Sequence, residues 1–203
     1  MTTALAIIFA YLLGSMPFGY IIYKMRKGGD IRKTGSAATG ATNVARSLGI
    51  VYAIIVTVLD VSKGFFPVLL SMHLWPTNQW LHVAVAIAAI IGHCFPIWIN
   101  FRGGKGVNTA LGTAFAISWP AAIIAIGFFG VVFFVFKFVS IASLAAACVF
   151  SISILIFGSF IDAHHIAIEV YAIFLPAIII FSHRSNIQRL IKGKELKPIK
   201  SEK

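Results

Sequence analysis

The stretch AAIIAIGFFGVVFFVFKFVSIASLAAACVFSISILIF, residues 121–157, decides the class of fold. A helix rises about 1.5 Å per residue, so this apolar run is too long to cross ~30 Å of hydrocarbon only once. Its single charged residue, Lys137, stands near the middle, and we expect the chain to turn there at a membrane surface. The stretch therefore predicts two consecutive transmembrane helices joined by a short turn.

The rest of the chain has the same apolar character. Of its 203 residues, 59% are hydrophobic and only 11% are charged, whereas a soluble domain has about a quarter of its residues charged. This composition excludes a soluble protein with a large core and predicts an all-α integral membrane protein with about seven transmembrane helices. The expected segments are 3–23, 49–74, 80–99, 107–118, 120–136, 138–159 and 164–182.

Two of these segments differ from an ordinary transmembrane helix in length or position. Residues 107–118 are too few for a full crossing, so they either tilt or form a re-entrant hairpin with 120–136. Residues 3–23 lack a basic start, so we interpret them as a retained helix and not as a cleaved signal. We expect one membrane domain over 1–193 and a short, basic, disordered cytoplasmic tail over 194–203 that contacts anionic lipid.

The positive charge predicts the orientation of the chain. The net charge is +11, and with seven segments sixteen of the 17 Lys and Arg residues fall on one side of the membrane. The positive-inside rule then places the C-terminus in the cytoplasm and the N-terminus outside. Because the chain lacks a soluble basic domain, the charge does not indicate nucleic-acid binding.

Three polar segments follow apolar runs, and all three fall on the predicted cytoplasmic side. They read TGSAATGATN at 34–43, FRGGKG at 101–106 and HRSNIQRL at 183–190. Exposed backbone N–H groups beside fixed cations bind anions. The pattern therefore predicts a phosphate site at the membrane surface, built from segments that are far apart in the sequence.

The first polar segment supplies four candidate ligands. Ser36 follows a glycine, which lets the backbone approach an anion. Thr42 or Asn43 can cap the helix that begins nearby and still offer a donor, and Arg46, one turn further, can grip two phosphate oxygens. The alternative is an ordinary flexible loop.

The other two polar segments supply the remaining candidates. Lys105 with the amides of Gly103 and Gly104 resembles a phosphate-binding turn, although it is not a Walker A motif, because Gly106 follows the lysine. The alternative is a flexible turn with positive-inside charges. His183 and Asn186 share one helical face, and the histidine can act as a base. The alternative there is an interfacial histidine at a basic helix end.

Several other polar residues receive structural interpretations. Asp60 and Lys63 lie three apart inside a span, and we expect them to pair with each other. Ser140 and Ser143 can reach the same cytoplasmic cavity or bond their own helix. We interpret the remaining histidines and both cysteines as packing, interface or loop residues, and we expect no metal and no cofactor. These residues are His73, His82, His93, Cys94, Cys148, His164 and His165.

Taken together, the motifs resemble those of the acyl-phosphate:glycerol-3-phosphate acyltransferase family of bacterial membranes. The resemblance extends over essentially the whole chain. It differs at Ala37 and Ala38, where the family usually has glycine and asparagine, and mildly at Arg102, where it has lysine. The motifs that carry it are Ser15-x-Pro17-x-Gly19, Gly40-Ala-Thr-Asn43 with Arg46, Leu59-Asp60-x-x-Lys63-Gly64, Gly92-His93-x-x-Pro96, Phe101-x-Gly-Gly-Lys-Gly106 and His183-x-x-Asn186-Ile187-x-Arg189-Leu190-x-x-Gly193-x-Glu195.

The resemblance implies transfer of a fatty acyl group from acyl phosphate to the sn-1 hydroxyl of glycerol 3-phosphate in phospholipid synthesis. Acyl phosphate is already activated, so the protein needs only to grip two phosphates and align one hydroxyl. The implied place is the bacterial inner membrane with the active site on the cytoplasmic face, and a soluble enzyme that makes acyl phosphate is a candidate partner. The implied catalytic residues are His183, Asn186, Lys105 and Arg46, and the implied substrate-binding residues are Ser36, Thr42, Asn43, Gly103, Gly104 and Ser143.

Two alternatives stay open at this point. The first is a small transporter or scramblase of phosphorylated metabolites or lipids, which polar residues through the membrane midplane would mark. The second is a degenerate family member that binds substrate without turnover, which the change at Ala37 and Ala38 suggests.

Overall fold

The computed structural model describes residues 2–158 and 165–197, and every regular element in these ranges is a helix. The predicted all-α class is therefore confirmed. In chain order the elements are α1 (Thr3–Gly14), α2 (Phe18–Lys27), the 3-10 helix η1 (Ile31–Lys33), α3 (Ala41–Leu48), α4 (Ile50–Leu74), α5 (Gln79–Cys94), the 3-10 helix η2 (Ile97–Ile99), α6 (Val107–Ile117), α7 (Trp119–Phe136), α8 (Val139–Phe157), α9 (Ile166–Ser182) and α10 (Arg184–Ile191).

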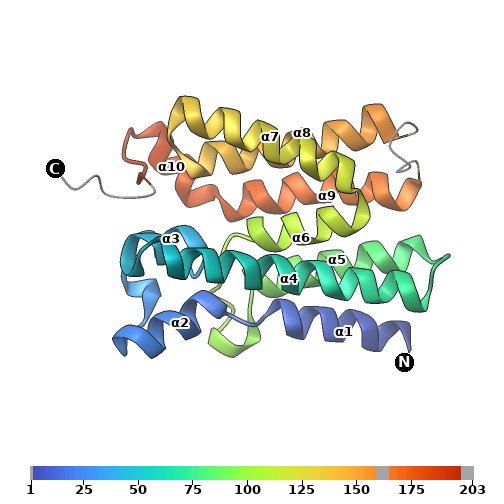
Figure 1. The fold of residues 1–203 in the computed structure, drawn as a ribbon, viewed down its shortest axis with the longest axis horizontal. Helices are drawn as coiled ribbons and strands as arrows, with labels where there is room; N and C mark the ends of the chain where they lie inside the picture. The colour runs from blue at the N-terminus through green and yellow to red at the C-terminus, as the bar shows by residue number, and fades with distance from the viewer. Residues whose placement is uncertain (1, 159–164, 198–203) are drawn as a thin grey trace.

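The turn predicted at Lys137 is present and joins α7 to α8 (Figure 1). Lys137 adopts a left-handed backbone with φ 59°, which ends α7, and its ammonium lies 4.2 Å from the centre of the Phe134 ring. At the other end of α7, Pro120 occupies the first turn, where a missing N–H breaks no helical hydrogen bond. The two helices pack against each other along their lengths.

The structure supports fewer certain membrane crossings than the seven predicted. Among the described residues, five helical stretches are long and apolar enough to cross a membrane, or six if α9 and α10, bent by 60°, count as one span. The first of the five, Thr3–Lys27, joins α1 and α2 across a break before Pro17, whose ring disfavours helical backbone at the preceding residue. The helix α6 has 11 residues and rises about 16 Å, which fits the short segment expected there. A count of seven crossings stays a prediction.

The helices form two groups with α6 between them (Figure 1). In Figure 1, α7, α8 and α9 lie in the upper half, α1, α4 and α5 lie in the lower half, and α6 contacts α4, α5, α7 and α9. Glycines lock α6 to α4, because a Cβ at Gly64 would collide with the carbonyl of Thr109 and a Cβ at Gly112 with that of Val61. Such close packing through small residues is common between membrane helices.

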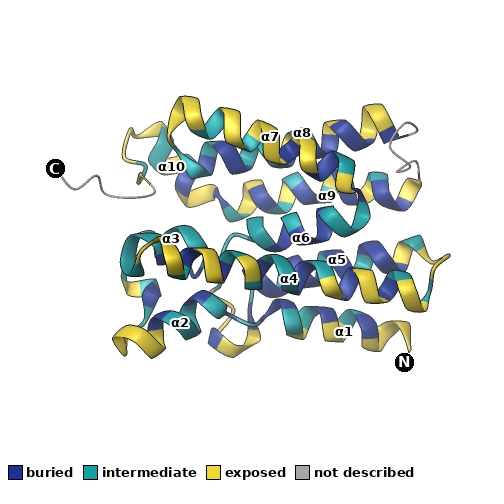
Figure 2. Ribbon diagram, in the orientation of Figure 1, coloured by how far each residue is buried: buried dark blue, intermediate teal, exposed yellow. Residues whose placement is uncertain are grey.

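The outer surface of the bundle is apolar. Figure 2 shows exposed residues along the outer sides of α1, α4 and α7 and buried residues towards the interior. The exposed side chains include Phe134, Val131 and Ile156. An apolar exterior of this kind suits contact with hydrocarbon, in which helices satisfy their own backbone groups.

The helices α2, α3 and α10 gather at one end of the bundle, and α1 begins at the opposite end (Figure 1). Residues from all three polar segments, among them Ser36, Lys105 and His183, line one cavity towards this end of the bundle. The fold therefore brings them together as predicted, while the side of the membrane that this end faces stays a prediction.

Candidate active site

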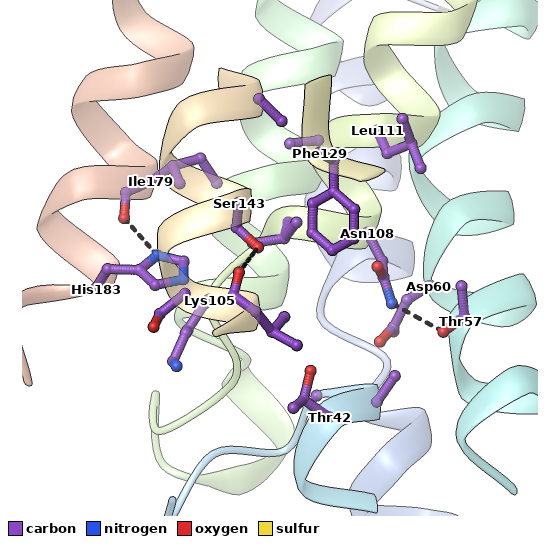
Figure 3. Close-up of a pocket in the computed structure, with 18 of the residues that line it drawn as sticks. Thr42, Thr57, Asp60, Lys105, Asn108, Leu111, Phe129, Ser143, Ile179 and His183 are labelled. Carbon is purple, nitrogen blue, oxygen red and sulfur yellow. Dashed lines mark hydrogen bonds between the residues drawn. The ribbon is translucent and has the colours of Figure 1, made fainter. Parts of the chain in front are cut away.

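A cavity of about 640 Å³ opens at this end of the bundle, between α4, α6, α7, α8 and α9. Figure 3 shows side chains from all three polar segments pointing towards it, with Thr42, Lys105 and His183 among them. The predicted site residues that line it are Ser36, Thr42, Asn43, Arg46, Lys105, Ser143, His183 and Asn186. The remaining two, Gly103 and Gly104, do not line it.

Asn43 organises the first polar segment. Its Nδ2 donates to the carbonyls of Ile31, Thr34 and Ala38 at 2.9–3.3 Å, and its Oδ1 accepts from the Ser36 amide at 3.0 Å. This buried side chain is thus occupied by the loop itself. It shapes the loop that presents Ser36 to the cavity, and it is not free to act as a phosphate donor.

The same loop explains the change at Ala37. Ala37 has a left-handed backbone with φ +58°, which a glycine adopts without strain. The loop nevertheless closes with alanine in this place, since the Ala37 amide donates to the carbonyl of Thr34 at 3.0 Å. The geometry of the first motif is therefore kept at the expense of local backbone strain.

We expect Ala37→Gly to stabilise the protein by about 1 kcal/mol, because a left-handed backbone costs an L-residue about 1–2 kcal/mol. The measurement is the thermal unfolding of the purified protein in detergent. Ala38→Gly is the matched control, because Ala38 is not among the residues with positive φ, and it should lower stability slightly. Equal shifts in the two variants would contradict the prediction.

Lys105 reaches the cavity from the loop between η2 and α6, and His93 fixes the course of that loop. The Gly103 amide donates to the Cys94 carbonyl at 3.2 Å, and the Gly104 amide donates to the His93 carbonyl at 3.1 Å. A Cβ at Gly104 would collide with Nε2 of His93. The two amides that we expected to grip a phosphate are thus bonded to carbonyls, and the glycines serve to place Lys105.

His93 is held in turn by buried polar groups. Its Nδ1 lies 3.1 Å from the Thr109 hydroxyl and 3.6 Å from an Asp60 carboxylate oxygen. Asp60 pairs with Lys63 at 2.7 Å, which confirms the expected pair, and Lys63 also donates to the carbonyl of Met16 at 2.8 Å. This network links α4, α5 and α6 to the break after α1, beneath the loop that carries Lys105. No partner of His93 could be predicted from the sequence, because Thr109 and Asp60 are distant from it in the chain.

Burial lowers the pKa of Lys105 to about 8, and the nearby cations of Arg189 and Arg46 act in the same direction, while Glu195 opposes them. The ammonium is still largely protonated at neutral pH. A cation that is partly out of water binds an anion more strongly than an exposed one, because the surrounding dielectric is lower. The position of Lys105 therefore suits a phosphate ligand.

His183 presents one ring nitrogen to the cavity. Its Nδ1 lies 2.9 Å from the carbonyl of Ile179, which can only accept a hydrogen bond, so Nδ1 carries the proton and Nε2 has a free lone pair (Figure 3). Burial and the charge of Lys105 lower the pKa of His183 to about 4. The ring is therefore neutral at pH 7, and Nε2 can accept a proton or a hydrogen bond from a substrate hydroxyl.

Glu195 also belongs to the site, although we expected it to lie in a disordered tail. Its carboxylate accepts hydrogen bonds from Asn186 at 2.6 Å, Ser140 at 2.9 Å and Arg189 at 3.0 Å. Burial alone would raise the pKa of Glu195, but these three donors lower it. The carboxylate is thus ionised, and it ties α8 and α10 together at the cavity.

Arg46 closes the same side of the cavity from α3. Its guanidinium donates to the carbonyls of Leu196 and Lys197 at 3.1 and 2.9 Å. Residues 194–197 therefore run back along the site and are not a free tail, whereas the rest of the predicted tail, 198–203, lies outside the described residues. The one signal in the sequence for this return was the Gly193-x-Glu195 spacing within the motif.

The remaining candidates have simple structural explanations. The Ser143 hydroxyl lines the cavity and donates to the Val139 carbonyl of its own helix at 2.8 Å (Figure 3). His82 bonds the Trp75 carbonyl, and His165 caps α9 through the Ala167 amide. His164 lies outside the described residues. Within the described ranges, no three His, Cys, Asp or Glu side chains are grouped so that they could hold a metal ion.

Comparisons with known proteins show relatives over nearly the whole chain. The family model described as glycerol-3-phosphate acyltransferase matches residues 4–193. The glycerol-3-phosphate acyltransferase of Aquifex aeolicus (strain VF5) is 41% identical over 189 residues, covering 93% of this chain and 95% of the relative. That of Prochlorococcus marinus (strain NATL1A) is 41% identical over 193 residues, covering 94% and 96%.

Two solved structures have the same fold. A crystal structure of PlsY (YgiH), an integral membrane glycerol 3-phosphate acyltransferase, in its glycerol 3-phosphate form superposes with a TM-score of 0.89 at 37% identity. The lysophosphatidic acid form of that protein gives 0.86 at 36% identity. Each comparison covers 96% of this chain and 94% of the other.

Proposed function

Because the chain belongs to the glycerol-3-phosphate acyltransferase family and is an acyltransferase, we propose that it transfers a fatty acyl group from acyl phosphate to the sn-1 hydroxyl of glycerol 3-phosphate. The products are lysophosphatidic acid and inorganic phosphate, and the reaction serves phospholipid synthesis. The observation that carries the proposal is the composition of the cavity, which joins cations, amides and hydroxyls at one end to an apolar arm at the other.

The polar end suits two phosphate groups. Lys105 and Arg46 supply the cations, and Ser36, which the first polar segment presents to the cavity, supplies a hydroxyl. The α3 helix begins at Ala41 without a side-chain cap. The Asn43 amide already donates to the Gly40 carbonyl at 3.0 Å, so the amides of Ala41 and Thr42 are the ones available to an anion. Such fixed donors also stabilise the charge that develops on the carbonyl oxygen as the tetrahedral species forms.

The apolar end suits an acyl chain. Its walls come mainly from alanines of α6, α7 and α8, with Phe129 and Phe133 of α7 nearer the opening and the exposed Ile50 and Ile126 at its side. A chain held there leaves its carbonyl carbon close to Lys105 and His183. The donor therefore enters with its tail in hydrocarbon and its phosphate among the cations.

The chemistry needs no covalent enzyme intermediate, because acyl phosphate is a mixed anhydride. The sn-1 hydroxyl oxygen attacks the carbonyl carbon, a new ester C–O bond forms, and the C–O bond to phosphate breaks. Two acceptors for the hydroxyl proton are at hand, the free Nε2 of His183 and an oxygen of the acyl phosphate itself. Asn186, which Glu195 holds by its amide, positions glycerol 3-phosphate beside His183.

The test uses the purified protein with palmitoyl phosphate and labelled glycerol 3-phosphate, and palmitoyl-CoA as the contrasting donor. We expect labelled lysophosphatidic acid from acyl phosphate alone, with the acyl group on the sn-1 oxygen. Lys192→Met, which removes an exposed charge outside the cavity, should leave the rate unchanged. Transfer from palmitoyl-CoA only, or acylation of the sn-2 oxygen, would overturn the proposal.

We further propose that the chain is a multi-pass protein of the bacterial inner membrane and that residues 1–193 form one membrane domain with the cavity facing the cytoplasm. A soluble enzyme that makes acyl phosphate would then deliver the donor to this face. The one-sided distribution of Lys and Arg supports this orientation.

A reporter that is active only in the cytoplasm tests the orientation. Fused after Lys203 it should be active, and fused before Met1 it should be silent. A reporter active only outside the membrane, fused at the same two places, should give the reverse pattern. An active outside reporter at the C-terminus would contradict both the orientation and the cytoplasmic site.

A further inference from the structure

One face of α8 changes from polar to apolar along the cavity. Its residues recur at helical spacing, so that serines stand at the phosphate end, alanines follow one turn deeper and a phenylalanine ends the series. The residues of α8 that line the cavity are Val139, Ser140, Ser143, Ala146, Ala147 and Phe150. Phe150 is thus the first large side chain on α8 that a tail would meet on its way inward.

Phe150 lies about two helical turns, or ~10 Å, beyond Ser143 along the axis of α8. The walls between them carry small side chains, because the other helices also contribute alanines there. These are Ala110 and Ala114 of α6 and Ala122 and Ala125 of α7. Phe150 lines the cavity and is 2% exposed, so its ring is buried at the deep end of this face of α8.

The ring of Phe150 is firmly supported from behind. It packs edge-on against Tyr171 of α9, with ring centres 6.0 Å apart and planes at 85°. Tyr171 is fully buried, and its hydroxyl lies 2.7 Å from the hydroxyl of Thr113, which in turn donates to the Ala110 carbonyl. A tail that reaches Phe150 therefore meets an aromatic pair fixed to α6 and α9 and not a mobile side chain.

We propose that Phe150, held by Tyr171, sets the upper limit on the length of the acyl chain that the protein transfers. This inference rests on the proposed function, because it takes the donor tail to lie in the apolar arm. The donor arrives from a bilayer with its tail already out of water, so burial alone cannot select its length. Selection must come from contact and exclusion inside the arm, and a fixed ring at its end supplies both.

The test is kcat/KM for a series of saturated acyl phosphates that differ by two methylenes, in detergent micelles of one composition. The wild-type protein should show a sharp fall beyond one chain length. Phe150→Ala should move this fall to longer chains, so that the first chain rejected by the wild type gains about tenfold relative to the best one, as expected for added methylenes in a shaped apolar pocket.

A second variant acts in the opposite direction and keeps the inference testable if Phe150→Ala does not fold. Ala147→Leu fills the arm one turn nearer the phosphate end, and it should move the fall to shorter chains. Phe128→Ala is the matched control, because this ring is exposed on α7 and does not line the cavity. Its chain-length profile should be that of the wild type.

The outcomes separate this inference from the function on which it rests. Opposite shifts in the two variants support it. Unchanged profiles in folded, active variants would overturn it while leaving the transfer reaction in place. A wild-type protein that transfers no chain from acyl phosphate would overturn the proposed function and this inference with it.

Discussion

Asp60→Ala should destabilise the folded protein by about 3–5 kcal/mol, the usual consequence of removing one partner from a buried ion pair. The Lys63 and Asp60 side chains are each 2% exposed and lie 2.7 Å apart. Without the carboxylate, the ammonium of Lys63 would keep, among the described residues, only the Met16 carbonyl and the face of the Phe18 ring as partners. The measurement is the shift in thermal unfolding in detergent, with retention on a size-exclusion column as the check on folding.

The double variant Asp60→Leu with Lys63→Met is the control for this prediction. It removes both charges and should recover most of the lost stability, because no uncompensated charge is left behind. In the double variant His93 loses its carboxylate neighbour, so Lys105 should be placed less accurately. We therefore expect a raised KM for glycerol 3-phosphate. If Asp60→Ala and the double variant were equally unstable, the pair would matter for shape and not for charge.

Lys105→Met should lower kcat/KM for both substrates by about 10- to 100-fold. A hydrogen bond to a charged group contributes about 1.5–3 kcal/mol, and each ~1.4 kcal/mol is a factor of ten in rate. Methionine keeps much of the length of the side chain and removes only the charge. Thermal unfolding of the variant should match that of the wild type, because Lys105 has no ion pair or hydrogen bond that it would leave unsatisfied within the described residues.

The titration of Lys105 should make the KM for glycerol 3-phosphate depend on pH. With a pKa of about 8 in the free protein, the Lys105 cation is present below this pH and is lost as the pH rises through it. The KM for glycerol 3-phosphate should therefore begin to rise near pH 8, well below the ordinary range of a lysine. Lys105→Arg keeps its charge at all these values and should remove the rise. A rise of the same size in that variant would assign the titration to another group.

The features of the fold and the site that could be predicted are those that depend on residues close together in the chain or on the pattern of charges. The hairpin at Lys137 was predictable because a single charge in a long apolar run is expected at the membrane surface and not in the hydrocarbon. The pairing of Asp60 with Lys63 was predictable because the partners are three residues apart on one helix. The meeting of the three polar segments followed from counting crossings, since all of them fell on one side.

The rest depends on contacts between distant residues. The structural role of His93 depends on its contacts with the loop at Gly104 and with Thr109 on another helix. Glu195 looked like one acid in a basic, solvated tail, and only the fold brings it to Asn186 and Ser140. The sequence predicts Asn43 as a ligand because an exposed amide and an amide that holds a loop together look the same in a sequence.

The place of Glu195 in the chain also bears on how the protein is made. It follows every helix that the structure describes, yet its carboxylate is what joins α8 to α10 at the cavity. A nascent chain leaving the ribosome therefore completes α1 to α10 before this contact can form. If the site works as proposed, a chain that stalls earlier during insertion would lack the carboxylate that holds Asn186.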